Sequence, residues 1–532
     1  MLKKCFFFLL IFCLSGHLAG QSSFPFYDYV NEKVRDTTTR NYLIKQYEGT
    51  ATAADVARFE AYYKKTYQSK SFSDEDLLED GAEPHIAIHP DDPGILAVSF
   101  MQNSEGGLSY PVFVSTDAGA SWTQSTFDSE AALSQAFPGD NQFGGGDPIL
   151  AFDDDGTLYL TYLYVHGSFL DINGGIFLVY SNDNGANFVI PPPDEHVVYD
   201  NDILSADILD RQWMDVDNTG GSYDGNLYMS AYYPGGDLNT QGQIVLTKPA
   251  GSNQFDLDNI AVAVPFGPNG EETQFGNIKV DQNGHVHVSC VYVNNSSGGG
   301  LIYHAVSTDG AQTFGTPVQA GQGGIFFPTQ FTGNETVIHD RENAATSMDV
   351  DGNNVYIAWT DLEDGESKAY FTYSNDGGQS FSPQTEFGNL LVDSVEVYHF
   401  FPAVAADSGR VSISWYTVDK ISGESNYYLA ESSDFGATFD SAMVIADETS
   451  SFDGGGFYGD YNSSVKKGCI TYSVWSDGRT GSPDVYIAKT NICEDIVVST
   501  PELSPVSDAF QVSYLWPNPA LNELNVEVTL RT

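Results

Sequence analysis

One turn motif recurs along the chain and limits the folds that the chain can adopt. In the octapeptide Ser374-Asn-Asp-Gly-Gly-Gln-Ser-Phe381, short polar side chains stand beside glycines, a composition typical of tight turns that hydrogen-bond to their own backbone. The final aromatic ring returns to the core, so the motif predicts the tip of a β-hairpin. Copies begin at Ser115, Ser181 and Ser432, and a fifth copy, with its glycine one place early, begins at Ser307. Five copies make this hairpin an internal repeat.

Alternating apolar strands and Asp/Gly turns surround these motifs. Seven stretches share a strand-turn-strand form at a spacing of roughly 60 residues, which suits the four-stranded blades of a propeller. They span residues 84–100, 148–163, 213–232, 275–292, 346–359, 402–415 and 461–475. The pattern therefore predicts an all-β fold, a β-propeller with seven blades, and six blades are the alternative.

The consensus Ser-x-Asp-x-Gly-x-x-Trp/Phe resembles the Asp-box of the sialidase-superfamily β-propellers. In that family the box is architectural and lies on hairpins away from the active face, and the sialidases themselves have six blades. The resemblance therefore implies structural roles for the five box aspartates, which are Asp117, Asp183, Asp309, Asp376 and Asp434.

The two ends of the chain differ from this repeat. Residues 1–20 carry Lys3 and Lys4, then an apolar run and small residues, the pattern of a secretory signal peptide. Residues 21–80 have apolar residues at helical spacing, which predicts a short helical N-terminal cap on a propeller spanning residues 81–495. Residues 496–510 have the composition of a linker. Residues 511–532 include Tyr514-Leu-Trp-Pro-Asn-Pro519 and resemble the start of the C-terminal sorting domain of type IX secretion, so a partial domain of that kind is expected.

The chain is strongly acidic, with 72 Asp and Glu against 22 Lys and Arg and a net charge of −50. This charge repels nucleic acid and anionic membrane surfaces, so neither is an expected partner. We interpret it as the solvated surface of a secreted protein without a transmembrane segment, which we expect to be a monomer outside the cell or at its surface. No metal or other cofactor is expected, and structural calcium in acidic loops such as Asp153-Asp-Asp155 is the alternative.

Three cysteines, Cys290, Cys469 and Cys493, follow the predicted signal peptide. A secreted protein meets an oxidising compartment, which permits disulfides. Cys469 and Cys493 flank one predicted hairpin, and we therefore predict that they form a bridge. Cys290 is then left as a buried thiol.

Candidate site residues come from aligning the seven repeats on their first turns. In a propeller the inner strand of each blade starts at one mouth of the central channel, so residues just before these strands meet in one pocket. The equivalent positions are Glu83, Asp147, Arg211, Phe275, Ala345, Phe401 and Asp460. Asp147 and Asp460 are the candidate catalytic pair, because a glycosidase needs one carboxylic acid and a second group as nucleophile or base. The alternative is that they cap strands by accepting backbone N–H groups.

Arginine and tyrosine supply the other candidates. Arg211, Arg341 and Arg479 stand beside turns or strand starts, and together with Glu83 they are assigned to substrate binding. Arginine binds carboxylates through two parallel hydrogen bonds, and the sialidase resemblance implies three arginines that clamp a sugar acid. It also implies a nucleophilic tyrosine in the last blade, where Tyr458 and Tyr461 stand, and Tyr458 is the assigned candidate. The opening Arg-Ile-Pro of that family is replaced here by Glu-Pro-His-Ile at 83–86, and salt-bridged scaffold arginines are the alternative.

Two functions fit these residues. The first is a secreted carbohydrate-active enzyme, a glycoside hydrolase or lyase that acts on acidic extracellular glycans, with an exo-sialidase as the nearest type. The second is a non-catalytic propeller that binds glycan or protein at the cell surface. The convergence of acids and an arginine at one mouth favours the enzyme.

Overall fold

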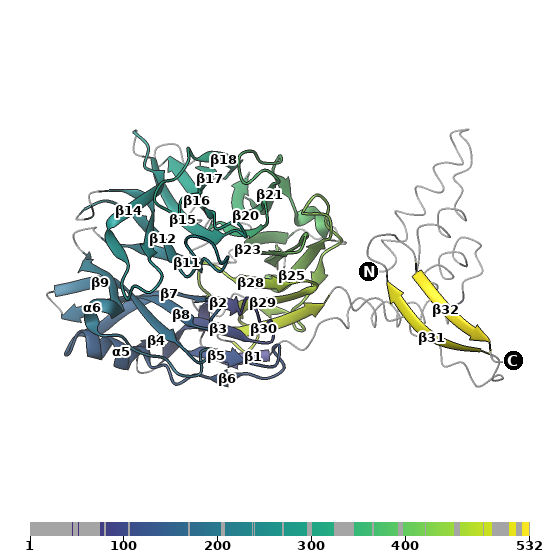
Figure 1. Ribbon diagram of the computed structural model, residues 1–532, viewed down its shortest axis with the longest axis horizontal. Coiled ribbons are helices and arrows are strands. Elements are labelled where there is room, and N and C mark those ends of the chain that lie inside the picture. Colours follow the sequence, from purple (N-terminus) through teal and green to yellow (C-terminus); the bar gives the residue numbers. More distant parts are fainter. Residues whose placement is uncertain are drawn as a thin grey trace. The chain divides into compact units, whose positions relative to one another are not determined.

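Seven sheets arranged as a ring make this protein a β-propeller (Figure 1). The computed structural model describes residues 81–104, 107–168, 171–203, 208–236, 240–268, 271–294, 300–323, 345–363, 366–391, 397–420, 422–451, 458–481 and 483–491, residues 45, 52 and 238, and strands at 75–78, 510–517 and 524–530. Each sheet is antiparallel and forms one blade, and the blades are numbered in chain order. The prediction of seven blades is therefore confirmed.

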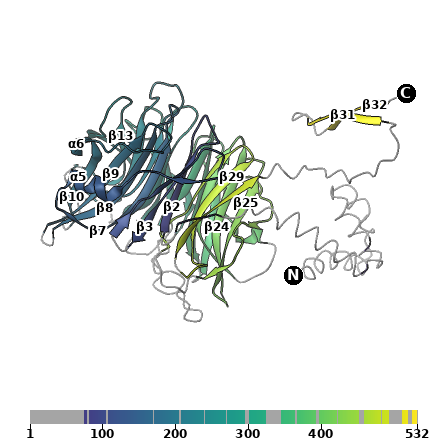
Figure 2. The ribbon, with the colours of Figure 1, turned by 90° about the horizontal axis from the view of Figure 1, so that it is seen from below.

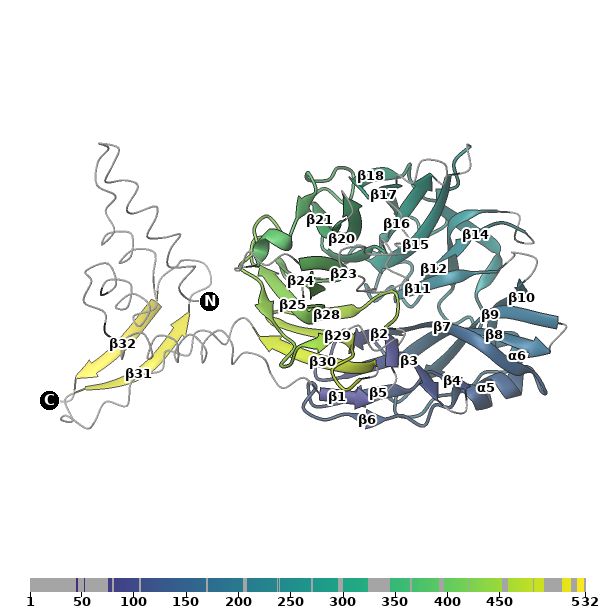
Figure 3. The ribbon, with the colours of Figure 1, turned by 180° about the vertical axis from the view of Figure 1, so that it is seen from behind.

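The first two strands of each blade lie nearest the middle of the ring (Figures 1 and 3). The innermost strands are β2 (Gly81–Ile88), β7 (Asn141–Phe152), β11 (Asp210–Val216), β15 (Glu271–Val280), β19 (Ser347–Asp351), β23 (Val397–Asp407) and β28 (Ser463–Lys467). The second strands are β3 (Leu96–Ser104), β8 (Leu158–Ser168), β12 (Leu227–Tyr233), β16 (Val286–Asn294), β20 (Asn354–Glu363), β24 (Arg410–Asp419) and β29 (Ile470–Asp477). These pairs correspond to the seven strand-turn-strand stretches expected from the sequence.

Two further strands complete each blade toward the rim. The third strands are β5 (Val112–Ser115), β9 (Asp171–Ser181), β13 (Gly242–Lys248), β17 (Gly300–Ser307), β21 (Glu366–Ser374), β25 (Glu424–Ser432) and β30 (Asp484–Asn491). The outer strands are β6 (Thr123–Gln124), β10 (Val197–Asp202), β14 (Asp256–Pro265), β18 (Val318–Gln322), β22 (Thr385–Glu386), β26 (Met443–Val444) and β1 (Glu75–Leu78). Short additions are β4 (Gly107–Ser109), β27 (Ser450–Ser451), α5 (Ser129–Ala136), α6 (Pro193–His196) and the 3-10 turn η3 (Gly388–Leu390).

The ring is closed by a strand from the N-terminal side. β1 pairs antiparallel with β30, so the last blade takes its outer strand from the start of the propeller sequence. Residues 75–78 fall in the segment that we expected to be a helical cap, and the propeller thus begins before residue 81. Figure 2 shows neighbouring blades from below, with β2 and β29 close together where the first and last blades meet.

The five copies of the turn motif, which we call Asp-boxes for their resemblance, all join the third strand of a blade to its fourth strand. In the box of blade 5, Asp376 Oδ1 accepts the Ser374 hydroxyl at 2.7 Å and the Ser380 N–H at 2.9 Å, and Ser374 Oγ accepts the Gly378 N–H at 2.9 Å. The box is therefore a self-contained turn, as its composition indicates. Blade 7 has no box because its third and fourth strands, β30 and β1, lie far apart in the sequence and no hairpin joins them.

We predict that Asp376→Ala destabilises the propeller by about 1 kcal/mol, because the turn loses several hydrogen bonds at a partly exposed position. Urea unfolding measures the change in the free energy of unfolding. Asn375→Ala, at an exposed neighbour in the same turn, is the matched control and should have a smaller effect. Equal stability of the two variants would contradict the assigned role of the aspartate.

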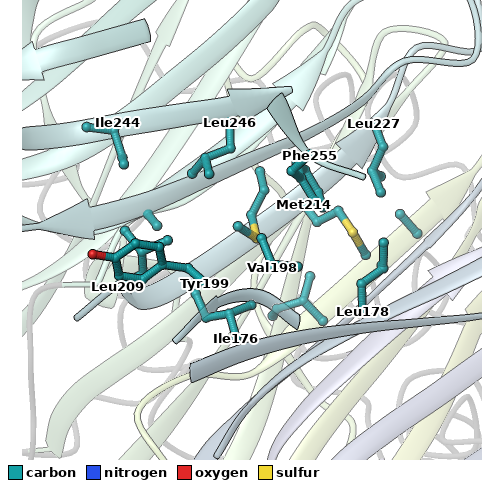
Figure 4. Packing of buried hydrophobic residues seen from close by; sticks show 14 of the residues in the cluster. Ile176, Leu178, Val198, Tyr199, Leu209, Met214, Leu227, Ile244, Leu246 and Phe255 are labelled. Atoms are coloured by element: carbon teal, nitrogen blue, oxygen red, sulfur yellow. The ribbon is translucent and has the colours of Figure 1, made fainter. Parts of the chain in front are cut away.

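Seven apolar clusters, counted over the described residues, hold the blades together. Each cluster is shared by two neighbouring blades, and the seven clusters match the seven neighbouring pairs. Between blades 2 and 3, Ile176 and Leu178 of β9 pack with Leu227, Ile244 and Leu246 of β12 and β13 (Figure 4). Since one cluster joins blades 7 and 1, apolar packing closes the ring together with the backbone pairing of β1.

A buried histidine links two carboxylates within blade 2. The side chain of His166 is fully buried, its Nδ1 lies 2.9 Å from Asp140 Oδ2, and its Nε2 lies 3.0 Å from Asp200 Oδ1. A neutral imidazole has one N–H, so only the protonated ring donates to both carboxylates. Burial lowers the pKa of His166, but the hydrogen bonds and charges of Asp200 and Asp140 outweigh it and raise the pKa above its ordinary value.

We predict that His166 makes the protein less stable as the pH rises above about 6.5. The pKa is raised in the folded state, so the stabilisation is fully present below the unfolded-state pKa and is lost as the pH rises through the folded-state pKa. Thermal unfolding followed from about pH 6 to about pH 9 should show a steeper decline in the native protein than in His166→Gln. Parallel profiles would contradict a charged His166.

Among the described residues, one cysteine is disulfide-bonded and one is a free thiol. Cys469, in the turn between β28 and β29, is disulfide-bonded. Cys493 lies outside the described residues, so its pairing with Cys469 stays a prediction. Cys290 on β16 is free and buried, and burial raises its pKa.

The last residues form a separate unit, 492–532, whose described part is a two-stranded hairpin. β31 (Phe510–Pro517) pairs antiparallel with β32 (Leu524–Leu530), in a register that sets Leu515 opposite Val526. The sorting-domain resemblance stays a prediction, as does the signal peptide, which lies outside the described residues. In the described part of the chain, no helix is long and apolar enough to span a membrane.

Candidate functional site

The inner strands share a bulge at the positions that the repeat alignment singled out. Glu83, Asp147, Arg211, Phe275 and Phe401 all adopt a left-handed backbone, with φ between 47° and 55°. In each blade the pairing between the inner and second strands is interrupted at this residue and the next one. Such φ values are strained for residues with a side chain, and bulges re-aim side chains. The bulge is thus part of the architecture, and in each of these five blades it sets the direction of one side chain.

These side chains surround one pocket. Six of the seven aligned positions line it, namely Asp147, Arg211, Phe275, Ala345, Phe401 and Asp460. The pocket therefore draws on blades 2 to 7. Its volume is about 30 Å³, enough for a water molecule or the end of one functional group.

Arg211 brings a positive charge into this pocket. Its Nη2 donates to Asp460 Oδ2, and its guanidinium carbon lies 4.6 Å from the centre of the Phe275 ring. Asp460 is buried, whereas 14% of the Arg211 side chain is exposed. Burial lowers the pKa of Arg211, but the carboxylates of Asp460, Asp147 and Glu83 raise it above its ordinary value. The guanidinium is therefore always charged and is held by its neighbour.

Asp147 is in a different environment from Asp460. Its N–H donates to Glu83 Oε2 at 3.1 Å, and its side chain is buried. Burial and the charge of Glu83 raise the pKa of Asp147 well above its ordinary value, although Arg211 lowers it. Asp147 therefore holds its proton more strongly than an ordinary aspartic acid, whereas Asp460 is the ion-pair partner of Arg211. Glu83, which we assigned to substrate binding, accepts the backbone N–H of Asp147 in the next blade. Such strand capping was the alternative that we named for Asp147 and Asp460.

Polar atoms that lack partners also line the pocket. Gln212 Oε1, Asn277 Oδ1 and the Tyr461 hydroxyl have no hydrogen-bond partner among the described residues, although all three side chains are buried. A buried polar atom without a partner is costly, so these atoms indicate a bound water or ligand group. We did not find Gln212 and Asn277 from the sequence. They stand one and two residues beyond the aligned positions, and extending the repeat alignment along each bulge would have named them.

Of the two tyrosines that the resemblance offered, Tyr461 lines the pocket, and the assigned candidate Tyr458 does not. Tyr458 is buried in the apolar cluster between blades 6 and 7. Tyr461 lines the pocket, and its ring packs edge-on against Trp213 with centroids 5.1 Å apart. Burial, with Asp147 and Glu83, raises the pKa of Tyr461 well above its ordinary value, so it is a neutral phenol.

Of the other two arginines, only Arg479 lies in the described part of the chain, and it does not line the pocket. Arg479 follows β29, and its Nη1 and Nη2 donate to Asp447 Oδ1 at 2.7 Å and Asp477 Oδ2 at 2.6 Å. These contacts fit the scaffold alternative for Arg479. Arg341 lies outside the described residues, so its assignment to substrate binding stays a prediction.

We predict that Asp460→Asn destabilises the protein by roughly 3 kcal/mol, because it leaves a buried guanidinium without its direct partner. Adding Arg211→Met should recover much of this loss, since the uncompensated charge is then gone. Urea unfolding of the native protein, both single variants and the double variant measures the coupling free energy. Strictly additive effects would contradict the ion pair.

Comparison with known proteins yields matches in shape alone. Neither a protein-family model nor a curated protein sequence matches the chain. Solved structures that resemble it include the NanB sialidase of Streptococcus pneumoniae, with 12% identity, a TM-score of 0.37, and coverage of 80% of this chain and 70% of that one. The GH93 α-L-arabinofuranosidase of Fusarium graminearum has 12% identity, a TM-score of 0.40 and coverage of 80% and 99%. A PL25 polysaccharide lyase, an ulvan lyase, has 12% identity, a TM-score of 0.42 and coverage of 81% and 98%. At these values the likeness carries no conclusion about activity.

Proposed function

We propose that the axial pocket is the floor of a carbohydrate site and that the protein is a carbohydrate-active enzyme, a glycoside hydrolase or lyase. The observation that carries this proposal is a pair of carboxyl groups in unlike environments on one pocket. Asp147 has its pKa raised by burial and by Glu83, whereas Asp460 is held beside Arg211. Such a pair suits a general acid and a base or nucleophile, with Asp147 in the first role and Asp460 in the second.

The size of the pocket supports recognition of one sugar substituent. A volume of about 30 Å³ admits a hydroxyl group of a sugar. Gln212, Asn277 and Tyr461 offer polar atoms that have no partner among the described residues. A hydroxyl that reaches these atoms would satisfy them, and a sugar lacking it would leave them unpaired, which is a strong source of specificity.

The charge of the pocket favours a neutral glycan over an acidic glycan as the ligand. The carboxyl groups of Glu83, Asp147 and Asp460 all act on Arg211, which among the described residues is the only arginine that lines the pocket, and Asp460 already balances its charge. The net charge of −50 also opposes the approach of a polyanion. Acidic glycans, expected from the sequence because arginine clamps carboxylates, are therefore the second substrate class to test.

A non-catalytic glycan-binding propeller is the second candidate function. The ion pair between Arg211 and Asp460 favours it, because a carboxylate engaged by a guanidinium is a weaker nucleophile and a weaker base. The same unpaired polar atoms would then serve binding alone.

We predict that Asp147→Asn lowers turnover by roughly two orders of magnitude, because an amide of the same size cannot donate the proton of a carboxylic acid. The purified full chain is incubated with neutral, uronate-containing and sialate-containing oligosaccharides. The products are separated by chromatography, and their masses are measured by mass spectrometry. Hydrolysis adds a water to the products of any of these oligosaccharides. Elimination leaves an unsaturated sugar and is open only to the uronate-containing ones, because it removes the acidic proton beside the carboxylate. Asp434→Asn, the same change in an Asp-box, is the matched control and should retain activity.

Three outcomes decide between these functions. Full turnover by Asp147→Asn would overturn its role as general acid. Binding of a glycan without turnover would support the second candidate. Neither binding nor turnover with any oligosaccharide class would contradict a carbohydrate site at the axis.

A further inference from the structure

A second group of polar side chains lies away from the axial pocket, at the end of the inner strand of blade 4. The turn from Asp281 to His285 joins β15 to β16, and it stands about 20 Å along β15 from the bulge at Phe275. Asp281, His285 and His287 each bring one ligand atom to a common point, with all three atoms within 4.8 Å of one another. Asp281 Oδ2 lies 3.0 Å from His285 Nδ1 and 3.5 Å from His287 Nε2. Nitrogen and oxygen ligands of a tetrahedral zinc ion lie about 3.3 Å apart, so these spacings suit a metal.

The corresponding turn of blade 2 provides a reference within the same chain. There Asp153 Oδ1 accepts the Thr157 N–H at 2.6 Å, and Asp153 Oδ2 accepts the Tyr159 hydroxyl at 3.2 Å. In blade 4 Asp281 Oδ1 likewise accepts the His285 N–H, at 2.9 Å. The backbone of the turn therefore needs no histidine. Blade 4 nevertheless has histidines at both places where blade 2 has threonine and tyrosine.

The buried histidine of the group has an atom that the protein leaves without a partner. His287 is 1% exposed, and its Nε2 has no hydrogen-bond partner among the described residues. Its Nδ1 lies 3.0 Å from His304 Nε2. If Nδ1–H donates to His304, the Nε2 lone pair faces the Asp281 carboxylate, an arrangement that a cation between them makes favourable.

His304 is held in place by the neighbouring blade. A Cβ atom on Gly378, in the Asp-box of blade 5, would lie 2.0 Å from His304 Cε1, so a glycine is needed there to admit the imidazole. His304 also packs edge-on against Phe381 of that box, with ring centroids 5.4 Å apart. A metal-binding histidine commonly donates its second ring N–H to a fixed acceptor, and His304 supplies that acceptor for His287.

We propose that Asp281, His285 and His287 bind a divalent transition-metal ion of the zinc type, with His304 as the outer partner of His287. Two imidazole nitrogens and one carboxylate suit zinc, whereas calcium and magnesium prefer oxygen ligands. Three protein ligands leave the fourth position to water. The His285 side chain is 35% exposed, so the ion has a path from solvent. The metal fastens the turn between β15 and β16 and is independent of the chemistry at the axis.

Zinc binding to the full chain tests this site. The protein is stripped with a chelator and titrated with zinc chloride, with metal content, calorimetry and thermal unfolding as readouts, and cobalt(II) is added separately as a spectroscopic probe. We expect one zinc per chain, an unfolding temperature that rises with zinc, and cobalt bands typical of mixed nitrogen and oxygen ligands. His285→Thr replaces a partly exposed histidine with the threonine that blade 2 has at the equivalent position. It should weaken zinc binding at least 100-fold and abolish the zinc-dependent rise in unfolding temperature.

Matched variants separate this site from other zinc binding. His89→Ala changes a histidine in the corresponding turn of blade 1, where His89 Nδ1 accepts the Asp91 N–H at 3.1 Å, and it should retain the full zinc stoichiometry. His287→Tyr should lose the metal while restoring the aspartate–tyrosine pair of blade 2. Should His287→Tyr fail to fold, His285→Thr alone decides. Less than about 0.2 zinc per chain at a saturating zinc concentration, or unchanged affinity in His285→Thr, overturns the proposal.

Discussion

Closure of the ring is the constraint on which the rest of the structure depends. Each blade buries its apolar faces only against its two neighbours, so every one of the seven clusters requires the blade on either side. β1 from the N-terminal side pairs with β30 and so completes the last blade with a strand that precedes the first blade in the sequence. Closure also protects sheet edges that would otherwise be exposed, and it makes each blade's stability depend on the whole ring.

The closed ring supports strain at its axis. Five non-glycine residues with left-handed backbones cost of order 1–3 kcal/mol each, and two of them are phenylalanines. The repeated bulge nevertheless concentrates one side chain from each blade at one place. Phe275 and Phe401 fill part of this place, which leaves a small pocket where Asp147, Arg211 and Asp460 meet. The architecture thus supplies a position, and the identity of each residue supplies the chemistry.

Repetition also supplies internal references for reading function. Where a residue makes the same hydrogen bonds in several blades, as in the Asp-box, the repeated fold accounts for that residue. Where one blade has a different residue at an equivalent position, the repeated fold does not account for the difference. Asp147 and Arg211 occupy a position that phenylalanine fills in blades 4 and 6, and His285 and His287 replace the threonine and tyrosine of blade 2. These departures mark the two places where we propose ligands.

The sequence by itself determined the all-β class, favoured seven blades over six and named six positions that line the axial pocket, because turn chemistry and strand alternation are local properties that repeat. It also identified the Asp-box aspartates as turn residues. Only the tertiary structure decided which side chains meet, because closure of the ring sets the distances between blades that are remote in sequence. It placed Asp460 beside Arg211, put Tyr461 rather than Tyr458 at the pocket and joined β1 to the last blade. It also set His304 against His287, since the packing of blade 5 on blade 4, and not any motif, positions that imidazole.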